Sequence, residues 1–117
     1  MIQQFTDRGG NNLHWKLVPT DSGFVEIVSE STGKALDLPG SNPDDGAKIQ
    51  QYTLNGGQNQ QWQFADEPDG FVKIVSRSSG KVLEVPGGAP DDGVQIEQST
   101  SLPTGDQHQH WRLVPIV

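Results

Sequence analysis

The sequence of 117 residues contains no cysteine. Disulfide bonds and thiolate chemistry are therefore excluded, whereas the compartment stays open because cysteine-free domains occur on both sides of membranes. No apolar run approaches the length of a membrane span, and no signal peptide is recognisable. We therefore expect a soluble chain without membrane insertion, and a module of a secreted protein remains an open alternative for its location.

Basic residues are also scarce. Lys and Arg number 8 against 15 Asp and Glu, which gives a net charge of −7, and the basic residues form no cluster. Such a chain repels phosphate, so neither nucleic acid nor an anionic membrane is expected as a partner. Hydrophobic residues make up only 32% of the chain. A single domain over residues 1–117 must therefore build its core from few apolar positions at regular intervals.

Helical periodicity is the third feature that the sequence lacks. No segment shows apolar spacing of three and four over a helical length. The 14 glycines and 8 prolines fall in clusters between short alternating or β-branched segments, which is typical of short strands joined by tight turns. The fold class that we predict is all-β.

What the sequence does contain is a recurring tryptophan motif. The chain's three tryptophans, Trp15, Trp62 and Trp111, lie 47 (62 − 15) and 49 (111 − 62) residues apart. Two of them end the pattern Gln-x-Trp, which begins at Gln60 and at Gln109, and Trp15 ends a diverged copy. Because apolar residues alternate after each Trp, we expect a strand with the Trp in the core and the flanking amides facing outward. The chain is predicted to be a repeat protein.

The chain aligns with itself at an offset of 47 residues without a gap for nearly a full repeat, and the last copy carries two extra residues in 101–106. The matching segments are 2–5 with 49–52 and 96–99, 23–29 with 70–76, 33–40 with 80–87, and 43–46 with 90–93. This alignment predicts one incomplete repeat, of which residues 1–22 are the second half, and two complete repeats at 23–69 and 70–117. In the first complete repeat we expect strands at 24–29, 34–38, 48–52 and 61–65.

Counting strands predicts about ten, two short of three full repeats. The missing pair would leave unpaired strand edges and a gap in the core. Three explanations are open: the chain is a truncation, another chain fills the gap, or the barrel tolerates being open. Truncation is the interpretation that we favour, with a partner chain covering the gap as its consequence, either a second copy or the rest of a multidomain protein.

Several motifs in fixed order resemble the ricin B-chain type of β-trefoil lectin. They are Gln-x-Trp at Gln60 and Gln109, Gly-Lys-x-Leu-Asp at Gly33, and Ile-Gln-x-aromatic at Ile49. The resemblance covers essentially the whole chain. It implies a β-trefoil of about 2.5 repeats, a barrel capped by hairpins with pseudo-threefold symmetry and the Trp of each repeat in the core. It also implies binding of galactose- or xylose-type sugars or glycans, often as a module of a glycoside hydrolase or toxin.

In that family each repeat can carry one shallow sugar site. The matching positions in the repeat 23–69 hold Asp37, Gln50, Tyr52, Asn59 and Gln60. These residue types suit sugar binding. A carboxylate accepts hydrogen bonds from sugar hydroxyl groups, and amides both donate and accept hydrogen bonds. A tyrosine ring offers an apolar face with a polar tip. Two alternatives stay open: Asp37 as an ordinary solvated strand residue, and Gln60 as a structural residue that holds Asp37.

The other repeats depart from this pattern. In the repeat 70–117 the site positions hold Glu84, Glu97, Ser99, His108 and Gln109. Two carboxylates and no ring predict a dead or altered site. The half-repeat keeps Gln3, Phe5 and Asn12 but has Leu13 in place of the Gln and lacks the Asp-bearing strand, so it cannot form a site within one chain.

Other chemistry is not expected. Asp44-Asp45-Gly46 and Asp91-Asp92-Gly93 lack the further ligands of a calcium site and follow Pro, so they predict turns. His108 and His110 have no third metal ligand, and we expect no metal or cofactor. The chain has no nucleophile–base arrangement or phosphate loop, so an enzyme is not expected. The alternative to sugar binding is a protein-interaction or protease-inhibitor trefoil that acts through loops such as 101–106.

Overall fold

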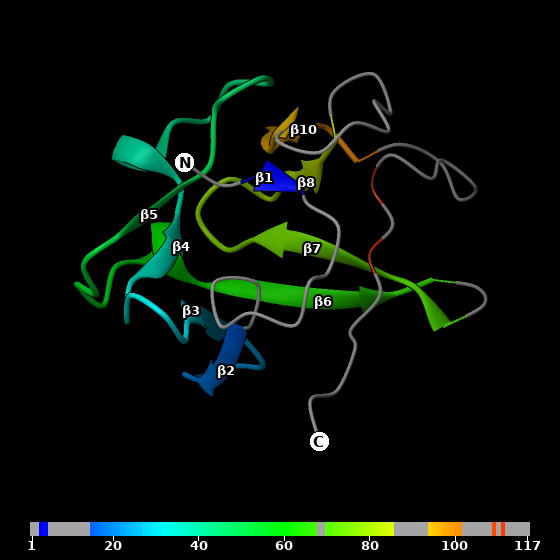
Figure 1. Ribbon diagram of the computed structural model, residues 1–117. Helices are drawn as coiled ribbons and strands as arrows, with labels where there is room; N and C mark the ends of the chain where they lie inside the picture. Colours follow the sequence, from blue (N-terminus) through cyan, green and yellow to red (C-terminus); the bar gives the residue numbers. More distant parts are fainter. Residues whose placement is uncertain are drawn as a thin grey trace.

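The computed structural model describes residues 3–4, 15–67, 70–85, 94–101, 109 and 111. These residues form ten short strands, joined by turns and the 3-10 helices η2 (Pro39–Ser41) and η3 (Gln58–Gln60) (Figure 1). The strands are β1 (Gln3–Gln4), β2 (Trp15–Pro19), β3 (Val25–Ser29), β4 (Ala35–Asp37), β5 (Gln50–Tyr52), β6 (Trp62–Asp66), β7 (Val72–Ser76), β8 (Val82–Glu84), β9 (Val94–Gln95) and β10 (Glu97–Ser99). The all-β prediction is confirmed.

Every strand pair is antiparallel. One sheet has the order β10-β8-β7-β6-β3-β4-β5, with β2 paired to β3, and a second sheet joins β1 to β9. Figure 1 shows β6 and β7 as the long central pair, and β5 is the terminal strand on the β4 side of the large sheet. Among the described strands, β5 is therefore an edge strand of this sheet, with only β4 paired to it.

The 47-residue repeat is visible in the backbone hydrogen bonds. In the β3–β4 turn Gly33 N–H donates to Ser29 O over 2.9 Å, and in the β7–β8 turn Gly80 N–H donates to Ser76 O over 2.9 Å. Both glycines have positive φ, 72° and 74°. That conformation strains a residue with a Cβ, which explains why the turn carries glycine in both repeats. Equivalent segments thus share one local structure.

The core collects apolar residues from both complete repeats. Trp62 is fully buried at its centre, and Trp15 and Trp111 are partly buried and packed against it. Two of the indoles donate to backbone carbonyls of strands with which they do not pair, Trp62 Nε1 to Leu36 O of β4 (3.3 Å) and Trp111 Nε1 to Leu83 O of β8 (3.2 Å). Buried indole N–H groups need such acceptors. The expectation that the tryptophans belong to the core is confirmed.

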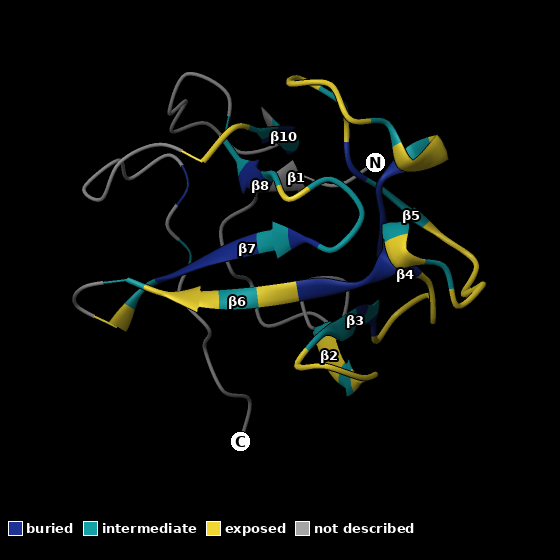
Figure 2. Cartoon of the chain, turned by 180° about the vertical axis from the view of Figure 1, so that it is seen from behind, coloured by how far each residue is buried: buried dark blue, intermediate teal, exposed yellow. Residues whose placement is uncertain are grey.

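The orientation predicted for the flanking amides is wrong at two positions. Gln60 and Gln61 are buried, whereas Gln63 is exposed as expected. Figure 2 shows that β6 is buried at its start and exposed at its end. The reason is that β6 begins only at Trp62, and Gln60 belongs to η3. Strand alternation therefore does not extend backward through the Gln-x-Trp motif, and the amides turn inward to hydrogen-bond partners.

The strand boundaries differ from those expected by one or two residues. β4 and β5 are shorter than predicted, and β6 starts and ends one residue later. Residues 68–69 lie outside the described part, so the repeat boundary at 69/70 stays a prediction. Among the described residues no helix is long and apolar enough to span a membrane.

Candidate functional site

Asp37 lies at the centre of a cluster of three amide side chains. It is the last residue of β4, faces Gln50 of β5, and is only 3% exposed. Gln50 Nε2 donates to Oδ1 over 3.1 Å, while Asn59 Nδ2 and Gln60 Nε2 donate to Oδ2 over 3.2 and 2.9 Å. A carboxylate offers roughly four acceptor positions. Three are filled, so Asp37 retains the capacity for about one further donor.

Gln60 serves to hold this carboxylate in place. Its Nε2 also donates to Thr53 O (2.9 Å), its Oε1 accepts the N–H of Asn55 (3.0 Å), and the residue is fully buried. Both polar atoms of its side-chain amide are thus engaged with the protein. Gln60 is a positioning residue, as the structural alternative proposed, and it fixes Asp37 and the segment that follows β5 together.

Asn59 closes the opposite side of the cluster. Its Nδ2 donates to Leu38 O (3.1 Å) as well as to Asp37, and its backbone carbonyl accepts the N–H of Leu38 (2.9 Å). Gly57 lies beside it, and a Cβ built on Gly57 would be 2.6 Å from Asn59 Oδ1. Gly57 has φ −74°, so a side chain at this position would disturb Asn59 by close approach and would not strain the backbone.

Tyr52 supplies the exposed part of the cluster. It is 54% exposed and lies two residues beyond Gln50 on β5, where it faces Ala35. Side chains two residues apart on a strand share a face and are separated by roughly 7 Å. The ring therefore lies on the same face as Asp37, about one sugar ring along the strand. The structure brings the five predicted residues together, but with the acid at the base of the cluster instead of on an open surface.

Free acceptors flank the carboxylate. Within the described part of the chain, neither Gln50 Oε1 nor Asn59 Oδ1 receives a hydrogen bond, and both residues are half-buried. An amide oxygen accepts a hydroxyl proton, and the remaining Gln50 N–H can donate to a hydroxyl oxygen. The cluster can thus pair with several adjacent hydroxyl groups at once.

The second predicted site is different in kind. Glu84 faces Glu97 across β8 and β10, in the same register as Asp37 and Gln50, and both are half-buried. Like charges placed directly opposite repel each other. Gln109 is fully buried and donates to Thr100 O (3.0 Å), which repeats the contact of Gln60 with Thr53. His108 lies outside the described residues.

The predictions for the half-repeat and for the histidines stay untested, because most of these residues lie outside the described part of the chain. Gln3 belongs to β1, while Phe5, Asn12, Leu13 and His110 lie outside the described residues. Among the described residues no three His, Cys, Asp or Glu side chains are grouped as metal ligands would be.

The Asp44-Asp45-Gly46 segment is a turn, as predicted. Asn42 Oδ1 accepts the N–H of Asp44 over 2.9 Å, and Gly46 has φ 84°. Sequence reasoning missed Gly57 and Thr53, although both lie in the turn-rich segment between β5 and β6.

A family model described as "Ricin-type beta-trefoil lectin domain-like" matches residues 1–52 and 58–117. Among solved structures, the designed threefold-symmetric protein ThreeFoil is 40% identical with a TM-score of 0.91, covering 97% of this chain and 79% of its own. The exo-β-1,3-galactanase 1,3Gal43A from Clostridium thermocellum is 41% identical with a TM-score of 0.90. There the alignment covers 97% of this chain but only 24% of the galactanase.

A more distant relative is a Macrolepiota procera ricin B-like lectin in complex with lactose. It is 18% identical with a TM-score of 0.77, and the alignment covers 92% of this chain and 74% of the lectin. A comparison with curated proteins found no match. These similarities confirm the predicted β-trefoil, of which this chain carries about 2.5 repeats.

Proposed function

The chain belongs to the ricin-type β-trefoil lectin domain-like family, and from this premise we propose that it binds carbohydrate at the Asp37 cluster without catalysing a reaction. The observation that carries the proposal is a buried carboxylate held by three amides on the same strand face as an exposed tyrosine ring. Lectin-type sugar binding needs this combination of fixed polar groups and an apolar platform.

Each group has a distinct part in binding. Asp37 accepts a hydrogen bond from a sugar hydroxyl group. The amide oxygens of Gln50 and Asn59 accept hydrogen bonds from neighbouring hydroxyl groups, and the remaining N–H of Gln50 donates one. Tyr52 packs against the C–H face of the sugar ring. Because Gln60 and Asn59 already hold the carboxylate, binding does not have to immobilise it. This preorganisation raises the affinity without adding a contact.

The ligand that we propose is a galactose- or xylose-type sugar, either free or at the end of a glycan. Support for galactose comes from the 41% identical galactanase, whose name describes action on a galactose polymer. For a shallow site with a few hydrogen bonds and one aromatic ring, we expect a dissociation constant on the order of millimolar, which corresponds to a binding free energy of about −4 kcal/mol. Attachment to a larger protein or self-association would supply avidity.

The test is a calorimetric titration with galactose, lactose, xylose and N-acetylgalactosamine. We expect millimolar binding of at least one of these sugars. It should be about tenfold weaker in Tyr52→Ala and lost in Asp37→Asn. It should be retained in Glu84→Gln, which changes the position equivalent to Asp37 in the other repeat. Indifference of all four titrations to both site variants would contradict the proposal. No described residue favours the loop-based inhibitor alternative, which predicts no sugar response at all.

A further inference from the structure

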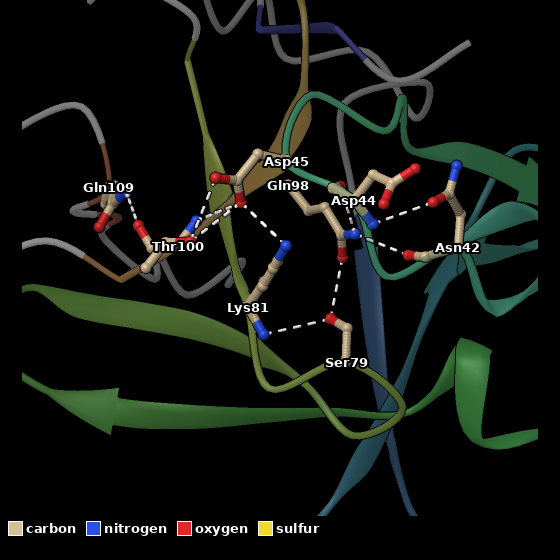
Figure 3. A network of polar contacts seen from close by, with 8 residues as sticks. All are labelled: Asn42, Asp44, Asp45, Ser79, Lys81, Gln98, Thr100 and Gln109. Carbon is tan, nitrogen blue, oxygen red and sulfur yellow. Dashed lines mark hydrogen bonds and ion pairs between the residues drawn. The ribbon is translucent and has the colours of Figure 1, made fainter.

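A polar network joins the two complete repeats at the turn formed by residues 42–46, which we call the acidic turn (Figure 3). Gln98 of β10 is fully buried, and its Nε2 donates to the carbonyls of Asn42 (2.7 Å) and Asp44 (2.8 Å). Its Oε1 accepts the hydroxyl of Ser79 over 2.9 Å. Gln98 therefore binds the backbone of the acidic turn through both N–H groups of its side-chain amide.

The same turn is held by a carboxylate. Asp45 Oδ1 accepts the backbone N–H (2.8 Å) and the hydroxyl (3.0 Å) of Thr100 and pairs with Lys81 Nζ at 3.1 Å. Hydrogen bonds from Lys81 and then Thr100 hold the pKa of Asp45 below its ordinary value. In addition, Gly46 N–H donates to Gln98 O over 2.8 Å. Lys81, Gln98 and Thr100 together form a receptor for one acidic turn.

The repeat 23–69 carries the same receptor residues 47 positions earlier. Lys34, Gln51 and Thr53 correspond to Lys81, Gln98 and Thr100. Their supporting contacts are also repeated: Thr32 Oγ1 donates to Gln51 Oε1 (2.7 Å), as Ser79 does to Gln98, and it accepts the N–H of Lys34 (3.2 Å). The glutamine is thus already held by its carbonyl oxygen, with its N–H groups left to bind a partner.

No described residue occupies this second receptor. Gln51 Nε2, Lys34 Nζ and the N–H and hydroxyl of Thr53 meet no acceptor in the part of the chain that the structure describes. Lys34 and Thr53 are exposed, Gln51 is half-buried, and all three lie on the outer pair β4–β5 or beside it. The acidic turn at residues 42–46 is itself engaged by Lys81, Gln98 and Thr100, so it is not free to serve here. The matching segment Asp91-Asp92-Gly93 lies outside the described residues.

We propose that Lys34, Gln51 and Thr53 form a docking surface for an acidic turn of another polypeptide segment, with the chemistry Asn-Pro-Asp-Asp-Gly. The chain's own network is the template. Two carbonyls of the incoming turn accept from Gln51, and an aspartate accepts from Thr53 and pairs with Lys34. The positive charge of Lys34 favours an aspartate of the incoming segment at this place. This inference does not depend on sugar binding.

A peptide with the sequence of residues 23–48 tests the proposal, because it carries the acidic turn with its flanking strand sequences. In an NMR titration of the labelled full chain we expect amide shifts at Lys34, Gln51 and Thr53 and little change at Lys81, Gln98 and Thr100. Replacing the aspartate of the peptide that corresponds to Asp45 by Asn should weaken binding about tenfold, since it removes a charge-assisted contact. In the protein, Lys34→Gln should weaken binding, whereas Lys81→Gln should not.

If the free peptide binds too weakly to be detected, the same segment can be tested when it is covalently joined to the chain. Joining the same segment ahead of residue 1 through a flexible Gly/Ser linker raises its effective concentration to the millimolar range. We expect a higher melting temperature, and we expect the Asp45-equivalent Asn substitution in the added segment to remove most of the increase. An unchanged melting temperature, a gain that survives this substitution, or self-association of the chain through this surface would overturn the proposal.

Discussion

Asp37 and Gln50 face each other across β4 and β5, and Gln50 Nε2 donates to Asp37 Oδ1 over 3.1 Å. One repeat later, Glu84 and Glu97 occupy the same register. The same strand pairing thus holds a carboxylate beside an amide in the repeat 23–69 and two facing carboxylates in the repeat 70–117. Because the strand pairing is shared, the two repeats differ at these two positions in their side chains and not in their strand register.

Removing the exposed ring of Tyr52 should lower the affinity for sugar without lowering the stability of the fold. Tyr52→Ala should weaken sugar binding about tenfold, because the apolar platform is lost, and should change the free energy of unfolding by less than about 0.5 kcal/mol at this exposed position. Calorimetric titration and urea denaturation measure the two effects. Leu17→Ala removes an exposed apolar side chain from β2 and serves as the control, with sugar affinity unchanged.

Gln60→Ala should destabilise the fold. The substitution leaves Thr53 O, the Asn55 N–H and Asp37 without their buried partner, and we expect a loss of about 2–3 kcal/mol in the free energy of unfolding. Denaturant titration measures it. The control is Gln63→Ala, an exposed amide on β6, for which a loss under about 0.5 kcal/mol is expected. Equal effects of the two variants would show that Gln60 holds nothing.

Gly57→Ala should disturb the cluster through Asn59. The new Cβ would lie 2.6 Å from Asn59 Oδ1 and 3.0 Å from Asn55 Oδ1, so these side chains must move and sugar binding should weaken several-fold. A double-mutant cycle checks the cause. In an Asn59→Ala background the same glycine substitution should have a smaller effect on affinity, whereas an equal effect in both backgrounds would rule out this route.

Acidification should weaken the acidic turn. Because the pKa of Asp45 in the folded chain is lowered by Lys81 and Thr100, its contribution to stability is present above the unfolded pKa of about 3.9 and is lost as the pH falls through the folded pKa. Asp45→Asn should therefore flatten the fall in stability below about pH 4, measured by denaturation at several pH values.

The control for this prediction is Asp44→Asn, since the Asp44 carboxylate forms no ion pair with any described residue. It should leave the pH dependence nearly unchanged. High salt should reduce the effect of Asp45, because the pair is exposed to solvent. A steeper dependence in Asp45→Asn than in the original chain would contradict the sign of the pKa shift.

The sequence predicted the repeat and the strands, because a fixed offset aligns turns and strands together. The five residues of the cluster were predicted from the resemblance to the ricin B-type lectins. The sequence did not predict the burial of Gln60 and Gln61, since the short helix η3 interrupts strand alternation before Trp62. Nor did it indicate that Asp45 binds Lys81 and Thr100. Such contacts between repeats depend on how the repeats pack against each other, and the residue spacing within one repeat does not predict that packing.

The central claim concerns Asp37, and a galactose titration of the labelled chain followed by NMR tests it most directly. The account predicts saturable shifts at Asp37, Gln50, Tyr52 and Asn59, absent in Asp37→Asn and unchanged in Glu84→Gln. Saturable shifts in Asp37→Asn equal to those of the original chain, or shifts confined to the face of Glu84 and Glu97, would contradict it.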